Sequence, residues 1–206
     1  MKHLRWVSVI CGSVATLLWA TGPLQAADSI GDGVDGAPLR YHIRADGTIR
    51  DDNTLLIWEK KDEGTGIHSV RRGFTWSVNG IDPDGSAFTV FLYDLNNKCE
   101  KDETTVCTQN ADCTKAGGGQ CGYAGHRDWR MPNIKELQSI VDYSQLDPAL
   151  ALSFPGSRHV GILNFYWSST TFAADSTYVW SIDFGGGDVN PASKTDGQIV
   201  RAVRGP

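Results

Sequence analysis

The chain has 206 residues, of which 40% are hydrophobic and 21% charged, and it is long enough for one domain with a substantial core. Its formal net charge of −5 argues against nucleic acid as a partner, because phosphate binding needs clustered Lys and Arg side chains. Seven tryptophans and 23 glycines favour an irregular, loop-rich fold held by large aromatic side chains over a helical bundle.

The N-terminus predicts a secretory signal peptide over residues 1–26. Lys2 and Arg5 give a positive start, residues 6–20 form an apolar run, and small residues at 26–27 suit cleavage. The run is short for a membrane span of about 20 residues, so we expect cleavage and no membrane span in the mature chain. Loss of the two basic residues takes the formal net charge from −5 to −7.

The next segments predict a leader, a β-hairpin and a helix. Residues 27–38 are rich in Gly and Asp and predict a flexible leader, so the domain is expected over residues 39–206. Within residues 40–61, Asp46-Gly47 is a strong turn signal for a hairpin. Residues 82–96 begin with turn residues and continue with apolar side chains at helical spacing. That apolar face consists of Phe88, Phe91, Leu92 and Leu95.

Four cysteines lie in one polar stretch, residues 97–122, which we call the insert. An even number of cysteines in an exported chain predicts disulfides. Gaps of seven, five and seven residues do not match zinc sites, whose ligands come in pairs two to four residues apart. Three pairings are open. We favour Cys99–Cys113 with Cys107–Cys121, because crossed bridges tie the insert into one compact knob.

A second helix and several short strands are predicted after the insert. Pro132 precedes Asn133, a good N-cap, and Glu136 completes a capping box; the helix is expected to end near residues 142–143. Its buried stripe comprises Ile134, Leu137, Ile140 and Val141. Strand-like segments follow over residues 165–172, 177–184, 187–191 and 198–205. This order predicts an α+β domain with an antiparallel sheet.

The residues that could carry chemistry form no recognisable catalytic set. The histidines of the mature chain are scattered, Ser168-Ser169 lacks the GxSxG setting of a nucleophile elbow, and no Gly-rich phosphate loop occurs. The sequence therefore predicts neither an enzyme nor a cofactor or metal site.

Six segments occur in one order in this chain: DGTIRDDNTLLIWEKK, GSAFTVFLYDLN, AGHRDWRMPNIKELQSIVDY, YWSSTT, VWSIDFGGGDV and VRAVRG. The series resembles the family named for the C-terminal domain of the Legionella collagen-like protein (the Lcl C-terminal domain), over about residues 41–205. The RMPNIKE segment is also similar to a motif of the formylglycine-generating enzymes. The resemblance implies a C-type-lectin-like α+β domain with two main helices and many loops. It does not imply the activity of those enzymes, which depends on cysteines late in the chain; here none follows Cys121.

The chain departs from the family pattern in two places. Family members tend to have Gly-Leu-Met-Trp where this chain has Leu55-Leu56-Ile57-Trp58. Many relatives also carry a cysteine where Arg127 stands, close to a partner at the Cys121 position. That local bridge cannot form here, so Cys121 is expected to pair within the insert.

Asp128-Trp129-Arg130, just before the second helix, is expected to have a structural role. We expect Trp129 to be buried between helix and sheet, and Arg130 to pair with Asp142 or Asp183. Asp128 is expected to accept backbone N–H groups in the turn. Other residues expected to be structural are Trp58, Pro132, Glu136, Trp167, Ser168 and Ser169.

Binding is expected on loops held by this scaffold, namely the connection over residues 153–164 and the loop over residues 185–198. The candidate binding residues have polar side chains that suit hydrogen bonding to sugars or polar peptide surfaces: Arg158, His159, Asn164, Asp188, Asn190 and Lys194.

The function expected is a secreted, non-catalytic binding or adhesion module, located outside the cell, on its surface or in the periplasm, with a glycan or a surface protein as partner. The resemblance implies an adhesin, since the name-giving family member binds sulfated glycosaminoglycans through a trimeric domain. The acidic charge of this chain makes a sulfated polyanion a poor generic ligand. One alternative is a structural component that assembles with other surface or matrix proteins; a weaker one is an uncharacterised hydrolase.

Overall fold

The computed structural model describes residues 40–114, 117–151, 154 and 164–206. The expected signal peptide and leader, and the binding candidates Arg158 and His159, lie outside the described residues. The described elements, in chain order, are β1 (Tyr41–Ile43), β2 (Thr48–Asp51), β3 (Ile57–Glu59), β4 (Phe74–Thr75), η1 (Ala87–Leu92), α1 (Tyr93–Asn97), β5 (Lys98–Cys99), β6 (Asp102–Val106), α2 (Asn110–Cys113), η2 (Tyr123–Gly125), α3 (Ile134–Gln138), β7 (Phe165–Thr171), β8 (Tyr178–Asp183), β9 (Asp188–Ser193), β10 (Gly197–Gln198) and β11 (Val203–Arg204).

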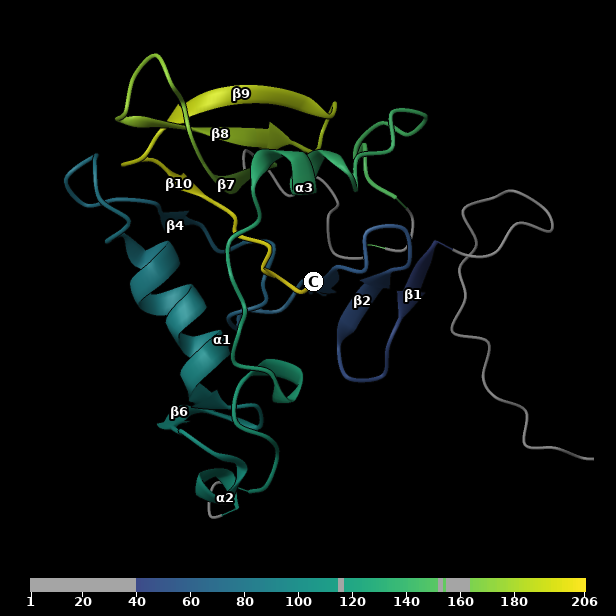
Figure 1. The fold of residues 1–206 in the computed structure, drawn as a ribbon, viewed down its shortest axis with the longest axis vertical. Coiled ribbons are helices and arrows are strands. Elements are labelled where there is room, and N and C mark those ends of the chain that lie inside the picture. The colour runs from purple at the N-terminus through teal and green to yellow at the C-terminus, as the bar shows by residue number, and fades with distance from the viewer. Residues whose placement is uncertain (1–39, 115–116, 152–153, 155–163) are drawn as a thin grey trace, which may run out of the picture.

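The fold is α+β, as predicted, but its strands form several small antiparallel sheets instead of one. The described strands pair as β1-β2-β3-β11, β7-β8-β9, β10-β4 and β5-β6. Figure 1 shows β8 and β9 at one end of the long axis, with β6 and α2 of the insert at the other. The C-terminal segment is divided between β10 and β11, so it joins two sheets where the sequence predicted a single strand over residues 198–205.

The N-terminal hairpin is confirmed. β1 and β2 pair in antiparallel register, with Ile43 opposite Ile49. In the turn between them, Gly47 has φ +81°, a conformation that glycine adopts without a steric penalty. The Asp46 carboxylate accepts a hydrogen bond from the Thr48 N–H at 3.0 Å, which stabilises the turn.

The first predicted helix is confirmed as two consecutive segments, η1 with π-helical hydrogen bonding and α1. Its most buried side chains are Ala87, Phe91 and Leu95, four residues apart and therefore on one face. Phe88 and Leu92, predicted for the same face, are partly buried at its border. Gly85 precedes the helix where a Cβ atom would collide with the backbone of residues 75–77.

The second predicted helix begins where expected but ends early. Asn133 accepts a hydrogen bond from the Glu136 N–H at 2.9 Å, and the Glu136 carboxylate accepts one from the Asn133 N–H at 2.7 Å. The helix, α3, ends at Gln138 instead of near residues 142–143. The chain turns there because Val141 forms a β-bridge with Leu150.

Two apolar clusters form the core on either side of the C-terminal segment. The first surrounds Trp58 and includes Tyr41, Ile49, Leu137, Ile140, Tyr166, Ile182 and Val203. The second surrounds Trp167 and includes Phe74, Trp76, Phe91, Leu95, Trp129, Met131, Val179 and Val200. Because alternate residues of the C-terminal segment belong to the two clusters, this segment links them.

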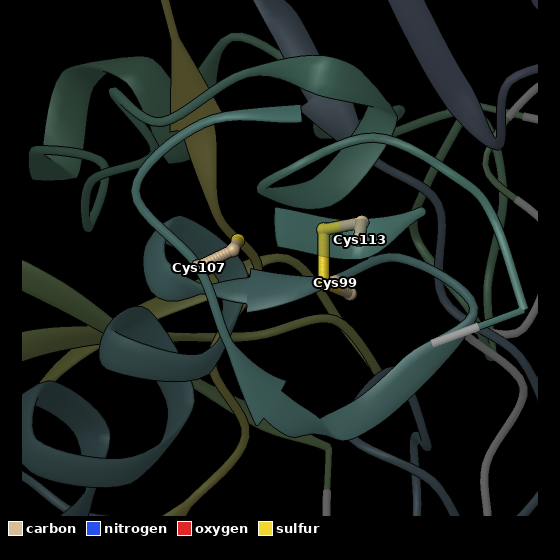
Figure 2. Close-up of side chains that lie close together, drawn as sticks. All are labelled: Cys99, Cys107 and Cys113. Carbon is tan, nitrogen blue, oxygen red and sulfur yellow. A yellow bond between two sulfur atoms is a disulfide. The ribbon is translucent and has the colours of Figure 1, made fainter. Parts of the chain in front are cut away.

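The insert is closed by two disulfides. Cys99 is bonded to Cys113 (Figure 2) and Cys107 to Cys121, which is the crossed pairing that we favoured from the sequence. Arg127, which stands where many relatives have a cysteine, donates hydrogen bonds to the carbonyl oxygens of Asn96, at 2.9 Å, and Thr108, at 2.5 Å. These hydrogen bonds connect the insert to the end of α1.

Leu55 has a backbone conformation that leucine rarely adopts. Its φ is +61°, in the left-handed region that disfavours residues with a Cβ atom. Its side chain is 54% exposed, so little packing offsets the strain. Leu55 stands where the family resemblance leads us to expect glycine, a residue that adopts this conformation without a steric penalty.

Opposite effects are expected from glycine at two neighbouring positions. Leu55→Gly should stabilise the fold by up to about 1 kcal/mol, because relief of left-handed strain exceeds the added freedom of the unfolded chain. Leu56→Gly should cost at least about 2 kcal/mol, since Leu56 is only 4% exposed. Urea denaturation of both variants measures the difference. If Leu55→Gly lowered the stability, the conclusion that the Leu55 backbone is strained would be wrong.

Candidate functional site

A groove lies against the three-stranded sheet, lined by residues of β7, β8 and β9 and by residues 196–198 at β10. Its volume is about 410 Å³, within the range typical of ligand pockets. The lining combines aromatic and apolar side chains with hydroxyl and amide groups. The residues are Phe165, Tyr178, Ser181, Asn190, Pro191, Ala192, Ser193, Asp196, Gly197 and Gln198.

Strand register positions the polar floor of the groove. Ser181 of β8 lies opposite Trp167 of β7 on one side and opposite Asn190 of β9 on the other. Directly opposed residues project to the same face of a sheet, so the three side chains form a row. Trp167 is fully buried and its Nε1 donates to the Phe74 carbonyl at 2.7 Å, whereas Asn190 is exposed. The row therefore runs from the core to the surface.

Gln198 presents an unusual acceptor beside the groove. The residue is only 7% exposed, and within the described part of the chain its Oε1 atom has no hydrogen-bond partner. A buried acceptor without a partner costs about 1–3 kcal/mol.

The electrostatic character of the groove is nearly neutral. Asp196 is the one charged residue among those that line it, and the lining contains no Lys or Arg. Hydroxyls, amides and aromatic rings can hydrogen-bond and pack against an uncharged polar ligand. The described lining offers no cation to pair with sulfate or phosphate.

Of the four predicted binding residues that the structure describes, one lies in the groove. Asn190 lines it, while Asp188 is exposed at the start of β9 and Asn164 precedes β7, outside the lining. Lys194 was expected on a polar loop, but it is 3% exposed. Its ammonium donates to the Ile81 carbonyl at 2.8 Å and lies 4.2 Å from the Trp76 ring centroid. Residues 185–198, named as a binding loop, contain β9 and β10. The strand predicted over residues 187–191 corresponds to β9.

Trp129 is buried in the second core cluster, but its two neighbours have other partners than expected. Arg130 forms a two-fold ion pair with Glu136, at 2.7 and 2.8 Å, in place of Asp142 or Asp183. Asp128 accepts hydrogen bonds from the Arg204 guanidinium, at 2.7 and 3.2 Å, instead of from turn N–H groups. The Arg204 hydrogen bonds hold the pKa of Asp128 below its usual range, although burial opposes the shift.

Most of the other residues predicted to be structural are buried. Trp58, Trp167 and Ser168 are fully buried, Pro132 is buried and Glu136 half-buried. Ser169 is exposed and contributes through its backbone, since its N–H donates to the Pro132 carbonyl at 2.8 Å. This hydrogen bond fixes β7 against the start of α3.

A buried ionic cluster lies in the core, away from the groove. Glu59 and Lys61 are both buried, with 2.8 Å between carboxylate and ammonium. Glu59 also lies 2.7 Å from His68 Nδ1 and accepts a hydrogen bond from the Ala202 N–H at 3.0 Å. Burial lowers the pKa of Lys61 to about 8, against the attraction of Glu59. Both groups are enclosed, so the cluster serves the fold and cannot meet a ligand.

Together, the fold and its cross-links define an α+β protein with a disulfide-bonded insert, a class typical of oxidising compartments. The Lcl C-terminal domain family matches residues 47–204, and the chain belongs to that family. The family and the disulfides fit an extracellular or cell-surface module. No curated protein matches the chain. Within the described ranges, no helix has the length and apolar character needed to cross a membrane.

Proposed function

We propose that this protein is a secreted, non-catalytic binding module that recognises uncharged carbohydrate in the groove beside β9. The observation that carries the proposal is the composition of that groove, in which aromatic side chains adjoin hydroxyl and amide groups. Aromatic rings can cover the apolar faces of a sugar ring, and amides and hydroxyls can exchange hydrogen bonds with its hydroxyl groups.

The charge of the groove supports an uncharged ligand over a sulfated one. Lys194, the one predicted cationic binding residue within the described part of the chain, is enclosed beside Trp76. Among the lining residues, Asp196 would repel a sulfate group. A neutral glycan avoids this repulsion.

Export is part of the same proposal. A signal peptide over residues 1–26 would be cleaved after Ala26 or Ala27, and a leader over residues 27–38 would precede the domain. Export would deliver the domain to an oxidising compartment, where its disulfides form and persist. The insert then lies at the far end of the domain from the sheet that carries the groove (Figure 1).

Tyr178→Ala should weaken glycan binding while leaving the domain folded. Tyr178 is 37% exposed, so its truncation costs little stability, whereas it removes one of the two aromatic residues that line the groove. A glycan array with the mature protein identifies the ligand, and titration calorimetry with that ligand measures the loss, expected to be at least about tenfold in Kd.

Tyr93→Ala is the matched control. Tyr93 is 44% exposed, lies in α1 and does not line the groove. It should bind the ligand as the parent does. Equal losses in the two variants, or no loss in Tyr178→Ala, would remove the groove from the proposal, and binding of sulfated glycans alone would contradict the assigned ligand class.

A further inference from the structure

The groove reaches around the open edge of the three-stranded sheet. Within the described residues, β9 has a strand neighbour on one side only, and Figure 1 shows it outermost at that end of the domain. The register places Tyr178 opposite Ser193 and Trp180 opposite Pro191, and directly opposed residues share a face of a sheet. Ser181 projects to the other face, because side chains alternate along a strand. Since Tyr178, Pro191 and Ser193 line the groove as well as Ser181, the groove meets both faces at this edge.

Trp180 lies directly beside the part of the groove that passes around the edge. It is the cross-strand neighbour of Pro191, which is exposed and lines the groove, and it follows Tyr178 by two residues, about 7 Å along the strand. Trp180 and Phe172 are both half-buried. Their rings meet edge to face, with 5.0 Å between centroids and an interplanar angle of 84°. We call Phe172, Trp180 and Pro191 the Trp180 platform.

We propose that the Trp180 platform is a second sugar subsite, so that the ligand is an uncharged oligosaccharide that extends from the groove across the β9 edge. This inference rests on the proposed function of the groove. Aromatic rings can cover the apolar faces of a sugar ring. The indole of Trp180 is already held by Phe172, so it loses little conformational freedom when a ligand binds.

The β9 edge favours a glycan over another polypeptide as the occupant. A peptide strand binds an open sheet edge through backbone hydrogen bonds. Pro191, in the interior of β9, has no N–H to donate, and proline on an edge strand hinders such pairing. The platform residues carry no charge, so they suit the same uncharged ligand as the groove. A sugar chain needs only the exposed side chains of this edge and no backbone N–H.

Affinity for oligosaccharides of increasing length tests the proposal. A glycan array identifies the sugar repeat, and titration calorimetry compares the mature parent with Trp180→Ala, using the shortest oligosaccharide that binds and longer ones of the same repeat. The parent should bind the longer ligands at least about fivefold more tightly than the shortest. Trp180→Ala should bind every length with the affinity that the parent has for the shortest, which also shows that the variant is folded. Trp180→Leu, which retains an apolar side chain beside Phe172, gives the same comparison if Trp180→Ala folds poorly.

Tyr93→Ala, outside the groove and the platform, is the control and should keep the dependence on length. A parent that binds without dependence on length, or Trp180 variants that retain it, would contradict the second subsite and leave the groove in place. Folded Trp180 variants that lose the shortest ligand would place Trp180 in the groove itself. A parent that binds no glycan of any length would overturn the proposed function and the subsite together. If light scattering showed a dimeric parent and a monomeric Trp180→Ala, the platform would be an interface between copies of this chain and not a sugar subsite.

Discussion

Lys61→Met is expected to lower the free energy of unfolding by about 3–5 kcal/mol, because it leaves the Glu59 carboxylate buried without its cation. The methionine can fill the same space, since the Lys61 ammonium lies 4.4 Å from the Phe91 ring centroid in an apolar setting. His68 and the Ala202 N–H still contact Glu59, but the ammonium that lies 2.8 Å from the buried carboxylate is lost. The loss therefore comes from uncompensated charge and not from a cavity.

The double variant Glu59→Gln/Lys61→Met separates charge from packing. Glutamine keeps an acceptor for the Ala202 N–H and removes the buried charge, so the double variant should regain at least half of the stability lost by Lys61→Met. Urea denaturation of the parent and the two variants measures these values. A Lys61→Met protein within about 1 kcal/mol of the parent would show that water reaches the Glu59 carboxylate.

The sequence alone predicted those structural features that depend on residues close to one another along the chain. The start of α3 follows from Asn133 and Glu136, three positions apart, and the hairpin turn follows from Asp46-Gly47. The end of α3 was wrong because the apolar spacing continues through Val141, whereas Val141 pairs with Leu150. The β-bridge between Val141 and Leu150 therefore ends the helix, although the apolar spacing of the local sequence favours a longer one.

Partners far apart in the chain were beyond this kind of prediction. Asp128 and Arg204 are 76 positions apart, and no local pattern relates them. For Arg130, an ion-pair partner only six positions away was not predicted. Glu136 was assigned to the capping box alone, although its carboxylate accepts hydrogen bonds from both the Asn133 N–H and the Arg130 guanidinium. A capping carboxylate has two oxygens, and it can accept from a backbone N–H and an arginine together.

The groove illustrates the same limit for the candidate site. Asn190, which lines the groove, was named because polar residues in a Gly-rich segment suggest a binding loop. The same argument put Lys194 on a polar surface, whereas its long side chain turns inward over Trp76. Phe165 and Gln198 were not identified as site residues. Strand alternation could have put Phe165 on the face of Trp167, but nothing local indicates that β10 passes beside it.

Trp129→Ala is expected to destabilise the domain by about 3–5 kcal/mol, as loss of a buried tryptophan does. Trp129 is 3% exposed, and its Nε1 donates to the Tyr123 carbonyl at 2.9 Å. Asn96 clamps its backbone, accepting from the Trp129 N–H at 2.8 Å and donating to the Trp129 carbonyl at 2.9 Å. Truncation would leave a cavity between α1 and η2, where the Tyr123 ring packs 5.2 Å from that of Trp129.

Trp129→Phe is the conservative comparison, because it keeps an aromatic ring and removes the hydrogen bond to Tyr123. It should cost clearly less than Trp129→Ala, since a neutral hydrogen bond contributes about 1 kcal/mol. Denaturant unfolding gives both values, and calorimetry with the glycan ligand should show that the folded fraction of each variant binds like the parent, because Trp129 does not line the groove. If Trp129→Ala unfolded like the parent and lost only binding, Trp129 would be a ligand-contacting residue and its assignment to the core would be wrong.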